Sequence, residues 1–211
     1  MSEIESAQQV CNISIDYSQV GGKPVLPFLI ALDLQASDLE PTPGNNQRFC
    51  YKITGIGEDK CNSADLSHFV LGICDKITEE EIKNISVTID GDEQDVIFGD
   101  NVELRSASNP DPPTGCPGLK FDFGLDKVEG EMTFCFELTT SYPIGSTQVC
   151  LFGGGRTAKG LSICGPVCGE TVQPCKTVVY QPVSVCVPVT IKPYANKLPT
   201  TTFCCGGPII T

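Results

Sequence analysis

The 211-residue chain has no tryptophan, a single histidine and no stretch approaching the roughly 20 apolar residues of a membrane span. With only His68 available, a Ser/His or Cys/His catalytic pair would have to use this residue, and no nucleophile elbow lies near it. A lone histidine in the apolar stretch "SHFVLGIC" is more often structural than catalytic. We therefore expect a protein that is not an enzyme.

Positive charge is also scarce. The sequence carries 26 acidic residues against 14 basic ones, a net charge of −12. A negative surface repels phosphate backbones and anionic lipid headgroups. Neither nucleic acid nor an anionic membrane is expected as the main partner.

Cysteine, in contrast, is abundant. Thirteen cysteines indicate disulfides in an oxidising compartment, or metal sites, and an odd number leaves one for an intermolecular bond or a free thiol. No repeated C-x₂-C knuckle of the zinc type occurs, which favours disulfides. The first residues, "MSEIESAQQVCNISIDYS", lack the basic and apolar regions of a secretory signal. We expect a disulfide-rich chain without a classical signal peptide; a trimmed signal is the alternative.

Glycine and proline, 37 residues together, separate short apolar runs. In "MTFCFEL", Met132, Phe134, Phe136 and Leu138 share one face and Cys135 lies on the other, the period of a half-buried antiparallel strand. Repeated short strands between such turns predict an all-β antiparallel sandwich, jelly-roll or Ig-like. The expected strands span residues 10–18, 24–35, 48–54, 67–74, 85–90, 118–125, 132–140, 146–153 and 158–164.

One short helix is expected near residues 79–84. Thr78 and Glu81 have the spacing of a capping box, and Glu79 and Glu80 fall in the first turn, where the helix dipole favours anions. The helix would be a connector on the sandwich.

The character of the chain changes near residue 164. We expect an N-terminal arm at 1–9, a β-sandwich body at 10–163, and a Cys- and Pro-rich tail at 164–211. Residues 1–163 hold 25 acidic and 11 basic side chains, whereas the tail holds Lys176, Lys192 and Lys197 against Glu170. The tail has too few large apolar residues to form a core of its own.

The tail contains a one-sided strand at 183–191. Its apolar side chains all point one way: Val183, Val185, Val187, Val189 and Ile191. Pro182 and Pro188 lack N–H donors on the same backbone edge, so the strand can pair fully on the other edge only. Such a strand closes its own sheet or completes that of a neighbour by β-augmentation.

Two adjacent cysteines, Cys204 and Cys205, lie near the end of the tail. Neighbouring Cα atoms are about 3.8 Å apart, while a relaxed disulfide needs roughly 4.4–6.8 Å, so the two are poorly placed to bond each other. We expect them to bond other partners. The full set of candidate cross-linking residues is Cys11, Cys164, Cys168, Cys175, Cys186, Cys204 and Cys205.

Ligand-binding signals are weak. Asp90, Asp92 and Asp95 form a weak calcium candidate, because their spacing departs from an EF-hand loop and Asp90-Gly91 is first a hairpin turn. "LFGGGRTAKG" lacks the Lys-Ser/Thr of a Walker loop and is better explained as a glycine-rich turn. We expect no cofactor.

Two stretches resemble known proteins. The body, with "SHFVLGIC", "GLKFDFGL" and "MTFCFELTTSYPIGSTQVCLFGGG", resembles a β-rich domain of bacterial extracellular and surface proteins over about residues 48–168. The tail, "VSVCVPVTIKPYANKLPTTTFCCGGPII", is similar to Cys- and Pro-rich segments of exosporium and spore-appendage proteins of endospore-forming bacteria. The resemblance implies a non-enzymatic surface protein, made in the mother cell cytoplasm and cross-linked around its lysis.

These observations together predict a self-assembling structural protein of the cell exterior or spore surface. The chain would be a fibre or layer subunit that joins copies of itself head to tail by strand addition and disulfides, with other surface proteins as further partners. Two alternatives remain open. The tail folds back on its own body, or the chain is a monomeric carbohydrate- or cell-wall-binding module, although it has only 5 tyrosines for a sugar platform.

Overall fold

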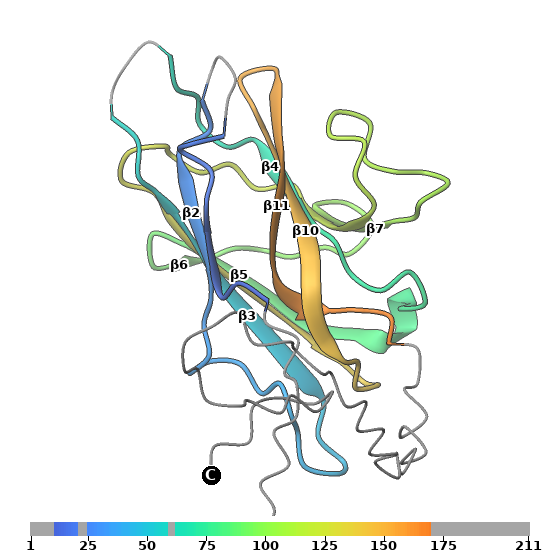
Figure 1. Ribbon diagram of the computed structural model, residues 1–211. Coiled ribbons are helices and arrows are strands. Elements are labelled where there is room, and N and C mark those ends of the chain that lie inside the picture. Colours follow the sequence, from blue (N-terminus) through green and yellow to red (C-terminus); the bar gives the residue numbers. More distant parts are fainter. Residues whose placement is uncertain (1–10, 21–24, 59–61, 170–211) are drawn as a thin grey trace, which may run out of the picture. The chain divides into compact units, whose positions relative to one another are not determined.

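The computed structural model describes residues 11–20, 25–58 and 62–169, which form an all-β sandwich of two antiparallel sheets (Figure 1). One sheet has the strand order β1-β2-β3-β9-β5-β6 and the other β11-β10-β4-β8-β7. The elements are β1 (Ser14–Asp16), β2 (Phe28–Leu32), β3 (Gln47–Gly55), β4 (His68–Leu71), η1 (Glu79–Glu81), β5 (Ile82–Ile89), β6 (Asp92–Glu93), β7 (Val102–Arg105), β8 (Gly118–Phe121), β9 (Glu131–Leu138), β10 (Ile144–Gly153) and β11 (Arg156–Pro166). The predicted fold class is confirmed.

An aromatic layer fills the space between the two sheets. As predicted, the inward face of β9 consists of Met132, Phe134, Phe136 and Leu138, all of which are buried. The ring centroid of Phe134 lies 4.7 Å from those of Phe69 on β4 and Phe121 on β8. One side chain of the first sheet therefore packs against two of the second.

Two buried tyrosines connect the sheets by hydrogen bonds. Tyr51 of β3 donates its hydroxyl to the carbonyl of Cys164 on β11 at 2.9 Å, and Tyr17 donates to the carbonyl of Val149 on β10. Burial raises the pKa of Tyr17 to about 12 and that of Tyr51 further still. Both hydroxyls therefore remain protonated donors at neutral pH.

The predicted turns are present. The strand pair β10–β11 closes through Gly154 and Gly155, both with positive φ, so "LFGGGRTAKG" is a hairpin turn. Asp90 (φ 52°) and Gly91 (φ 90°) join β5 to β6. Paired positive φ values in a two-residue loop match the right-handed twist of the flanking strands.

The predicted helix is shorter than expected. The capping box of Thr78 and Glu81 is present, but η1 is a single 3₁₀ turn and β5 begins at Ile82. The following residues, "IKNISVTI", carry four β-branched apolar side chains and pair with β9. The register shifts between Lys83 and Ser86, where Asn84 has a φ of 48°, the geometry of a β-bulge.

The edge strands β6 and β7 lie in an acidic stretch that was not predicted to form strands. They are only two and four residues long. Between them, the chain at 94–101 crosses from the first sheet to the second. Short polar strands give little periodic signal in the sequence.

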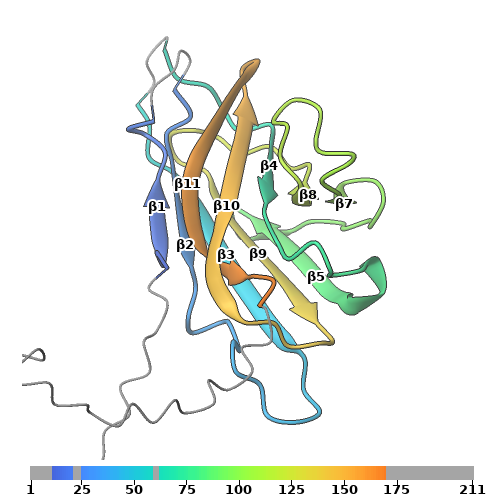
Figure 2. The ribbon, with the colours of Figure 1, turned by 45° about the vertical axis from the view of Figure 1, so that its right-hand side comes forward.

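The expected boundary after residue 163 falls inside β11, which continues to Pro166. The last residues of β11 belong to the body because they bond the segment just before β1: the N–H of Cys164 donates to the carbonyl of Asn12 at 2.7 Å. The Asn12 side chain donates to the carbonyl of Ser162 at 3.1 Å. These contacts make a seam between the two sheets (Figure 2).

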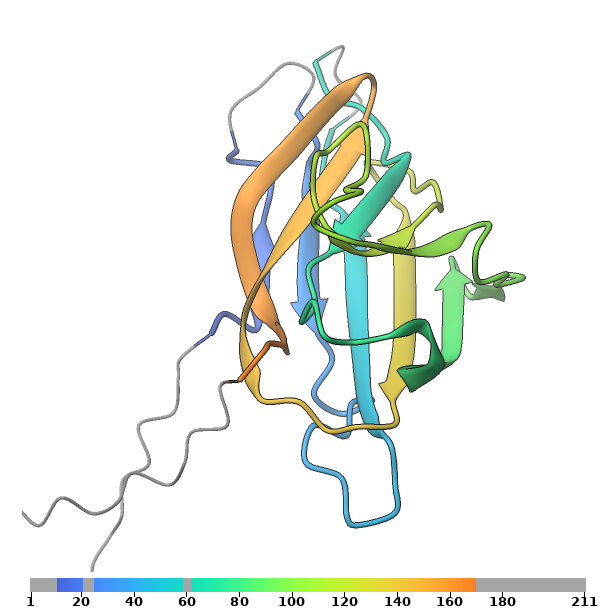
Figure 3. The same ribbon diagram turned by 90° about the vertical axis from the view of Figure 1, so that its right-hand side faces the viewer.

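The two long sides of the sandwich therefore differ. On one side β1 and β11 are joined by the seam. On the other side lie β5 and β7, which Figure 3 shows at the opposite edge. Beyond β5, strand β6 pairs with Thr88 and Ile89, and Gln94 bonds Val87, so within the described ranges Ile82–Ser86 has no further strand beside it.

The seam yields a stability prediction. Cys11 and Cys164 form a disulfide that closes a 153-residue separation. Cys11→Ser/Cys164→Ser is expected to lower the free energy of unfolding by about 2–5 kcal/mol, because the unfolded chain gains conformational entropy. Urea unfolding measures the loss, and hydrogen exchange at the residue-164 amide should accelerate. Unchanged exchange there would show that the backbone hydrogen bonds maintain the seam alone.

Candidate functional site

Eight cysteines of the described residues form four disulfides, as the cysteine count indicated. The pairs are Cys11–Cys164, Cys50–Cys135, Cys74–Cys168 and Cys116–Cys150. Cys50 and Cys135 are direct partners in the β3–β9 register. Cys135, on the face of β9 opposite the aromatic layer, therefore belongs to a disulfide that joins two neighbouring strands.

Three predicted cross-linking residues are paired within the chain in this structure: Cys11, Cys164 and Cys168. In this structure these three candidates therefore form bonds inside the body and not with a neighbouring subunit. The reason is the backbone, because the seam sets Cys11 beside β11, and the N–H of Cys74 donates to the carbonyl of Pro166 at 3.0 Å. Cys175, Cys186, Cys204 and Cys205, together with the strand at 183–191, lie outside the described residues, as does Cys61.

A shallow apolar groove lies on the open side of the sandwich. Ile82 is buried at its base, and Ile85, Val96 and Phe98 are half-buried along its walls. The groove separates β5 from the crossing segment at 94–101. We call it the β5 groove.

The backbone of β5 shows which of its residues point toward the open side. The carbonyl of Val87 accepts the N–H of Gln94 at 2.8 Å, so it points away from β9 and toward the open side. The side chain of Val87 is fully buried in the core. Backbone groups and side chains both alternate in direction along a strand. Residues of β5 whose backbone groups point to the open side therefore have side chains that point into the core.

Acidic residues border the groove. Glu79 and Glu80 line it together with Lys83. Hydrogen bonds from the backbone and from Thr78 lower the pKa of Glu80, which keeps this carboxylate charged. The three lysines of the tail carry the opposite sign.

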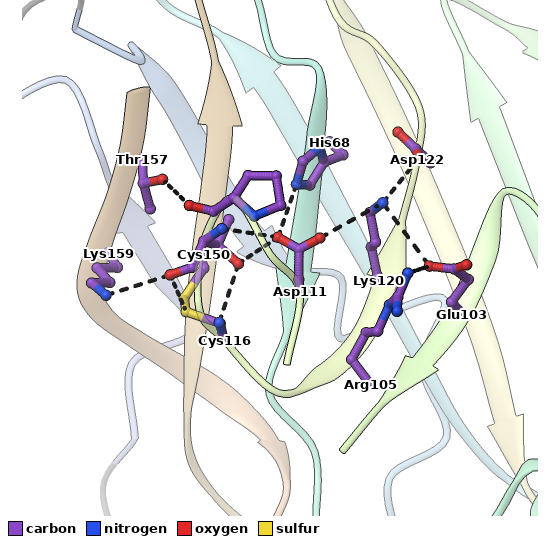
Figure 4. Close-up of polar contacts among 12 residues, drawn as sticks. His68, Glu103, Arg105, Asp111, Cys116, Lys120, Asp122, Cys150, Thr157 and Lys159 are labelled. Atoms are coloured by element: carbon purple, nitrogen blue, oxygen red, sulfur yellow. Dashed lines mark hydrogen bonds and ion pairs between the residues drawn. A yellow bond between two sulfur atoms is a disulfide. The ribbon is translucent and has the colours of Figure 1, made fainter. Parts of the chain in front are cut away.

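A second cluster lies on the outer face of the other sheet. Cys150, Val70, Lys120 and Glu103 are successive partners across β10, β4, β8 and β7 and form one row. The loop at 106–117 covers this row, and Cys116 bonds Cys150 at one end of it (Figure 4). With Val70 these cysteines make a small apolar cluster separate from the main core.

Asp111 holds this loop to the sheet. Its Oδ2 accepts hydrogen bonds from Thr114 N (3.0 Å), Thr114 Oγ1 (2.7 Å) and His68 Nε2 (3.1 Å). Burial by itself would raise the pKa of Asp111, but these hydrogen bonds together outweigh it and keep the pKa below its usual value. The lone histidine thus contacts a buried carboxylate that anchors a loop.

The calcium candidate is not assembled. Asp90, Asp92 and Asp95 are exposed, and Asp90 Oδ1 accepts the N–H of Glu131 instead. In the part of the chain that the structure describes, the one group of three potential metal ligands is Cys74, Asp75 and Cys168. Both sulfur atoms of that group are used in a disulfide.

No protein-family model, curated protein or solved structure matches this chain. Among the described residues, no helix is long and apolar enough to cross a membrane. The function must therefore be argued from the geometry of the chain itself.

The anchored loop yields a prediction. Thr114→Val removes the hydroxyl that donates to the buried Asp111 side chain, and the loss of a partner at a buried acceptor costs about 1–3 kcal/mol. Urea unfolding should show a loss of this size. Thr157→Val is the control, because the exposed Thr157 hydroxyl donates to the neutral Pro113 carbonyl, and it should cost at most about 1 kcal/mol. Equal losses would contradict the anchoring role of Asp111.

Proposed function

We propose that this protein is a structural, self-assembling subunit of an extracellular fibre or layer, of the spore-surface type. The observation that carries the proposal is the β5 groove, which lies on the only long side of the described sandwich that no seam closes. A sheet edge with apolar side chains beside it is a template for an incoming strand.

The strand at 183–191 has the chemistry that this groove requires. Its odd-numbered residues carry the apolar side chains, and the same residues keep their N–H groups on the edge without proline. On β5, backbone groups that face the open side likewise belong to residues that face inward, as Val87 shows. Pairing the two strands would bury the valines in the groove and at the same time form hydrogen bonds between the backbone groups of both strands.

A second copy is the proposed source of the strand. Thirteen residues, 170–182, separate the described body from Val183, and an extended chain spans at most about 3.3–3.6 Å per residue. The linker therefore allows a reach of up to roughly 45 Å from the body, and the proposal assigns this reach to a neighbouring copy. Donation by one copy into the groove of the next is a heterologous contact, which produces open filaments unless the rotation closes.

Disulfides would then make the contact permanent. Because Cys11, Cys164 and Cys168 are bonded within the body, the lock falls to Cys175, Cys186, Cys204 and Cys205. Cys186 is an even-numbered residue, so it lies on the strand face opposite the valines. Adjacent Cys204 and Cys205 would bond two different partners.

The setting of the protein follows from the same chemistry. Four disulfides in the body are typical of proteins that work in an oxidising environment. The disulfides support the proposal of an assembly outside the cytoplasm, with the chain itself as its main partner and other surface proteins as further ones.

The carbohydrate-binding alternative has less support. Tyr17 and Tyr51 are fully buried, and Tyr142 donates its hydroxyl to Glu81. The large apolar side chains exposed on the described residues are all aliphatic: Ile13, Leu34, Ile56 and Ile97. A stacking surface for sugar rings needs exposed aromatic faces. Retention of the protein on insoluble polysaccharides in a pull-down would favour this alternative.

Assembly predicts polymers that depend on both the strand and the groove. Negative-stain microscopy of the purified full chain should show filaments or layers, and a non-reducing gel should show covalent multimers. Val187→Lys in the strand and Ile85→Lys in the groove should each abolish them, since a charge would be buried at the contact.

Leu34→Lys is the matched control, because Leu34 is an apolar side chain that is 54% exposed outside the groove. It should leave polymers unchanged. Monomers alone at high concentration, in the wild-type protein and without reductant, would refute assembly and favour a tail that folds on its own body.

The lock predicts a separate phenotype. Cys204→Ser/Cys205→Ser should still form polymers, but these should dissolve in denaturant because strand pairing alone is reversible. Cys61→Ser, which lies outside the tail, should leave polymers resistant. Resistance that persists in the double variant would assign the lock to other cysteines.

A further inference from the structure

Asp111 combines complete burial with an unpartnered oxygen. The residue is 0% exposed, and all three hydrogen bonds to its carboxylate converge on Oδ2. Its Oδ1 has no hydrogen-bond partner among the residues that the structure describes. A buried polar atom left in this way calls for an explanation.

The nearest charged group to this oxygen is the amine of Lys120. The Nζ of Lys120 lies 3.7 Å from Asp111 Oδ1, close but beyond hydrogen-bond range, and the lysine side chain is only 12% exposed. Nζ also lies 3.0 Å from Asp122 Oδ2 and 4.0 Å from Glu103 Oε2. Figure 4 shows the Lys120 amine beside the Asp111 carboxylate.

We propose that Lys120 and Asp111 join in an intramolecular isopeptide bond. The buried carboxylate is the electrophile, the lysine amine is the nucleophile, and the loop at 106–117 becomes covalently closed onto β8. This inference concerns the body alone and is independent of the assembly proposed above.

The reaction needs no oxidant or co-reactant. The Lys120 ammonium gives one proton to Asp111 Oδ1, and the neutral amine attacks Cγ. The C–N bond forms and the Cγ–Oδ1 bond breaks. The Glu103 carboxylate carries a second proton from the nitrogen to Oδ1, and Oδ1 leaves as water. The charges of the ammonium and the carboxylate disappear together, and one water molecule is released.

The existing contacts stabilise the transition state. In the tetrahedral intermediate the negative charge resides on Oδ2, where Thr114 N, Thr114 Oγ1 and His68 Nε2 already converge. Fixed donors aimed at a developing oxyanion are the largest single source of catalysis in many acyl-transfer sites. Holding amine and carboxyl in contact supplies the remaining advantage, that of proximity.

The protein contains an internal comparison. Lys127 Nζ also lies 3.7 Å from a carboxylate oxygen, Asp65 Oδ1, but the Asp65 side chain is 59% exposed. That carboxylate is open to solvent, and the hydrogen bond that it accepts among the described residues comes from the backbone N–H of Lys127 at 3.2 Å. The two pairs have the same nitrogen–oxygen distance and differ in burial. We expect only the buried pair, Lys120 and Asp111, to react.

Peptide mass mapping tests the proposal on the folded, oxidised full chain after reduction and tryptic digestion. An isopeptide bond blocks cleavage after Lys120, so residues 106–127 should appear as one peptide, lighter by one water molecule. Without the bond, peptides 106–120 and 121–127 appear separately at full mass. Asp111 precedes Pro112, which has no N–H, so a succinimide at this position cannot mimic the loss.

Lys120→Arg is the matched variant, since it retains the positive charge but cannot form the bond. Its intact mass should be that calculated from its sequence, whereas the wild-type protein should be one water lighter. Glu103→Gln should slow the appearance of the linked peptide without abolishing it. Peptides 106–120 and 121–127 at full mass in the folded wild-type protein would overturn the proposal, and so would a water loss that maps to Lys127 and Asp65.

Discussion

The contact on which the structure depends is the packing of Phe134 against Phe69 and Phe121. This contact joins the two sheets, and strand alternation then turns the residues on either side of each ring toward the outer faces. The aromatic layer therefore determines which residues of these strands face outward. Cys135, one residue from Phe134, and Val70, one residue from Phe69, face outward, where disulfides and the anchored loop form a second level of structure.

That second level is distributed unevenly around the sandwich. One long side is closed by the backbone and by Cys11–Cys164, and the outer face of the second sheet is covered by the loop at 106–117. The β5 groove remains as an apolar edge with no further strand in the described residues. Three of the four disulfides, Cys11–Cys164, Cys74–Cys168 and Cys116–Cys150, hold the ends of the described body and the outer loop in place, and the proposed association would use the side left open.

The sequence predicts the buried strands and their turns better than the contacts on the outside of the sandwich. Period-2 alternation identified β9, and the Gly-Gly and Asp-Gly turns fixed two hairpins, because both signals are local. The pairing of Cys11 with Cys164 was not predictable, since residues 153 apart meet only through the seam. Nor did spacing reveal that Asp111, Lys120 and His68 converge, because they come from a loop and two strands. The tail strand stays a prediction.

The disulfides also define a path for mechanical load. The chain enters the body at Cys11 and leaves it at Cys168, and Cys11 is bonded to Cys164. Tension applied between the segment before Cys11 and the segment after Cys168 passes through one sulfur–sulfur bond and the few residues between Cys164 and Cys168. Of the sandwich, only the end of β11 lies on this path, where Cys164–Pro166 pair with β10. The aromatic layer and the other strands lie outside the shortest covalent route between the two segments.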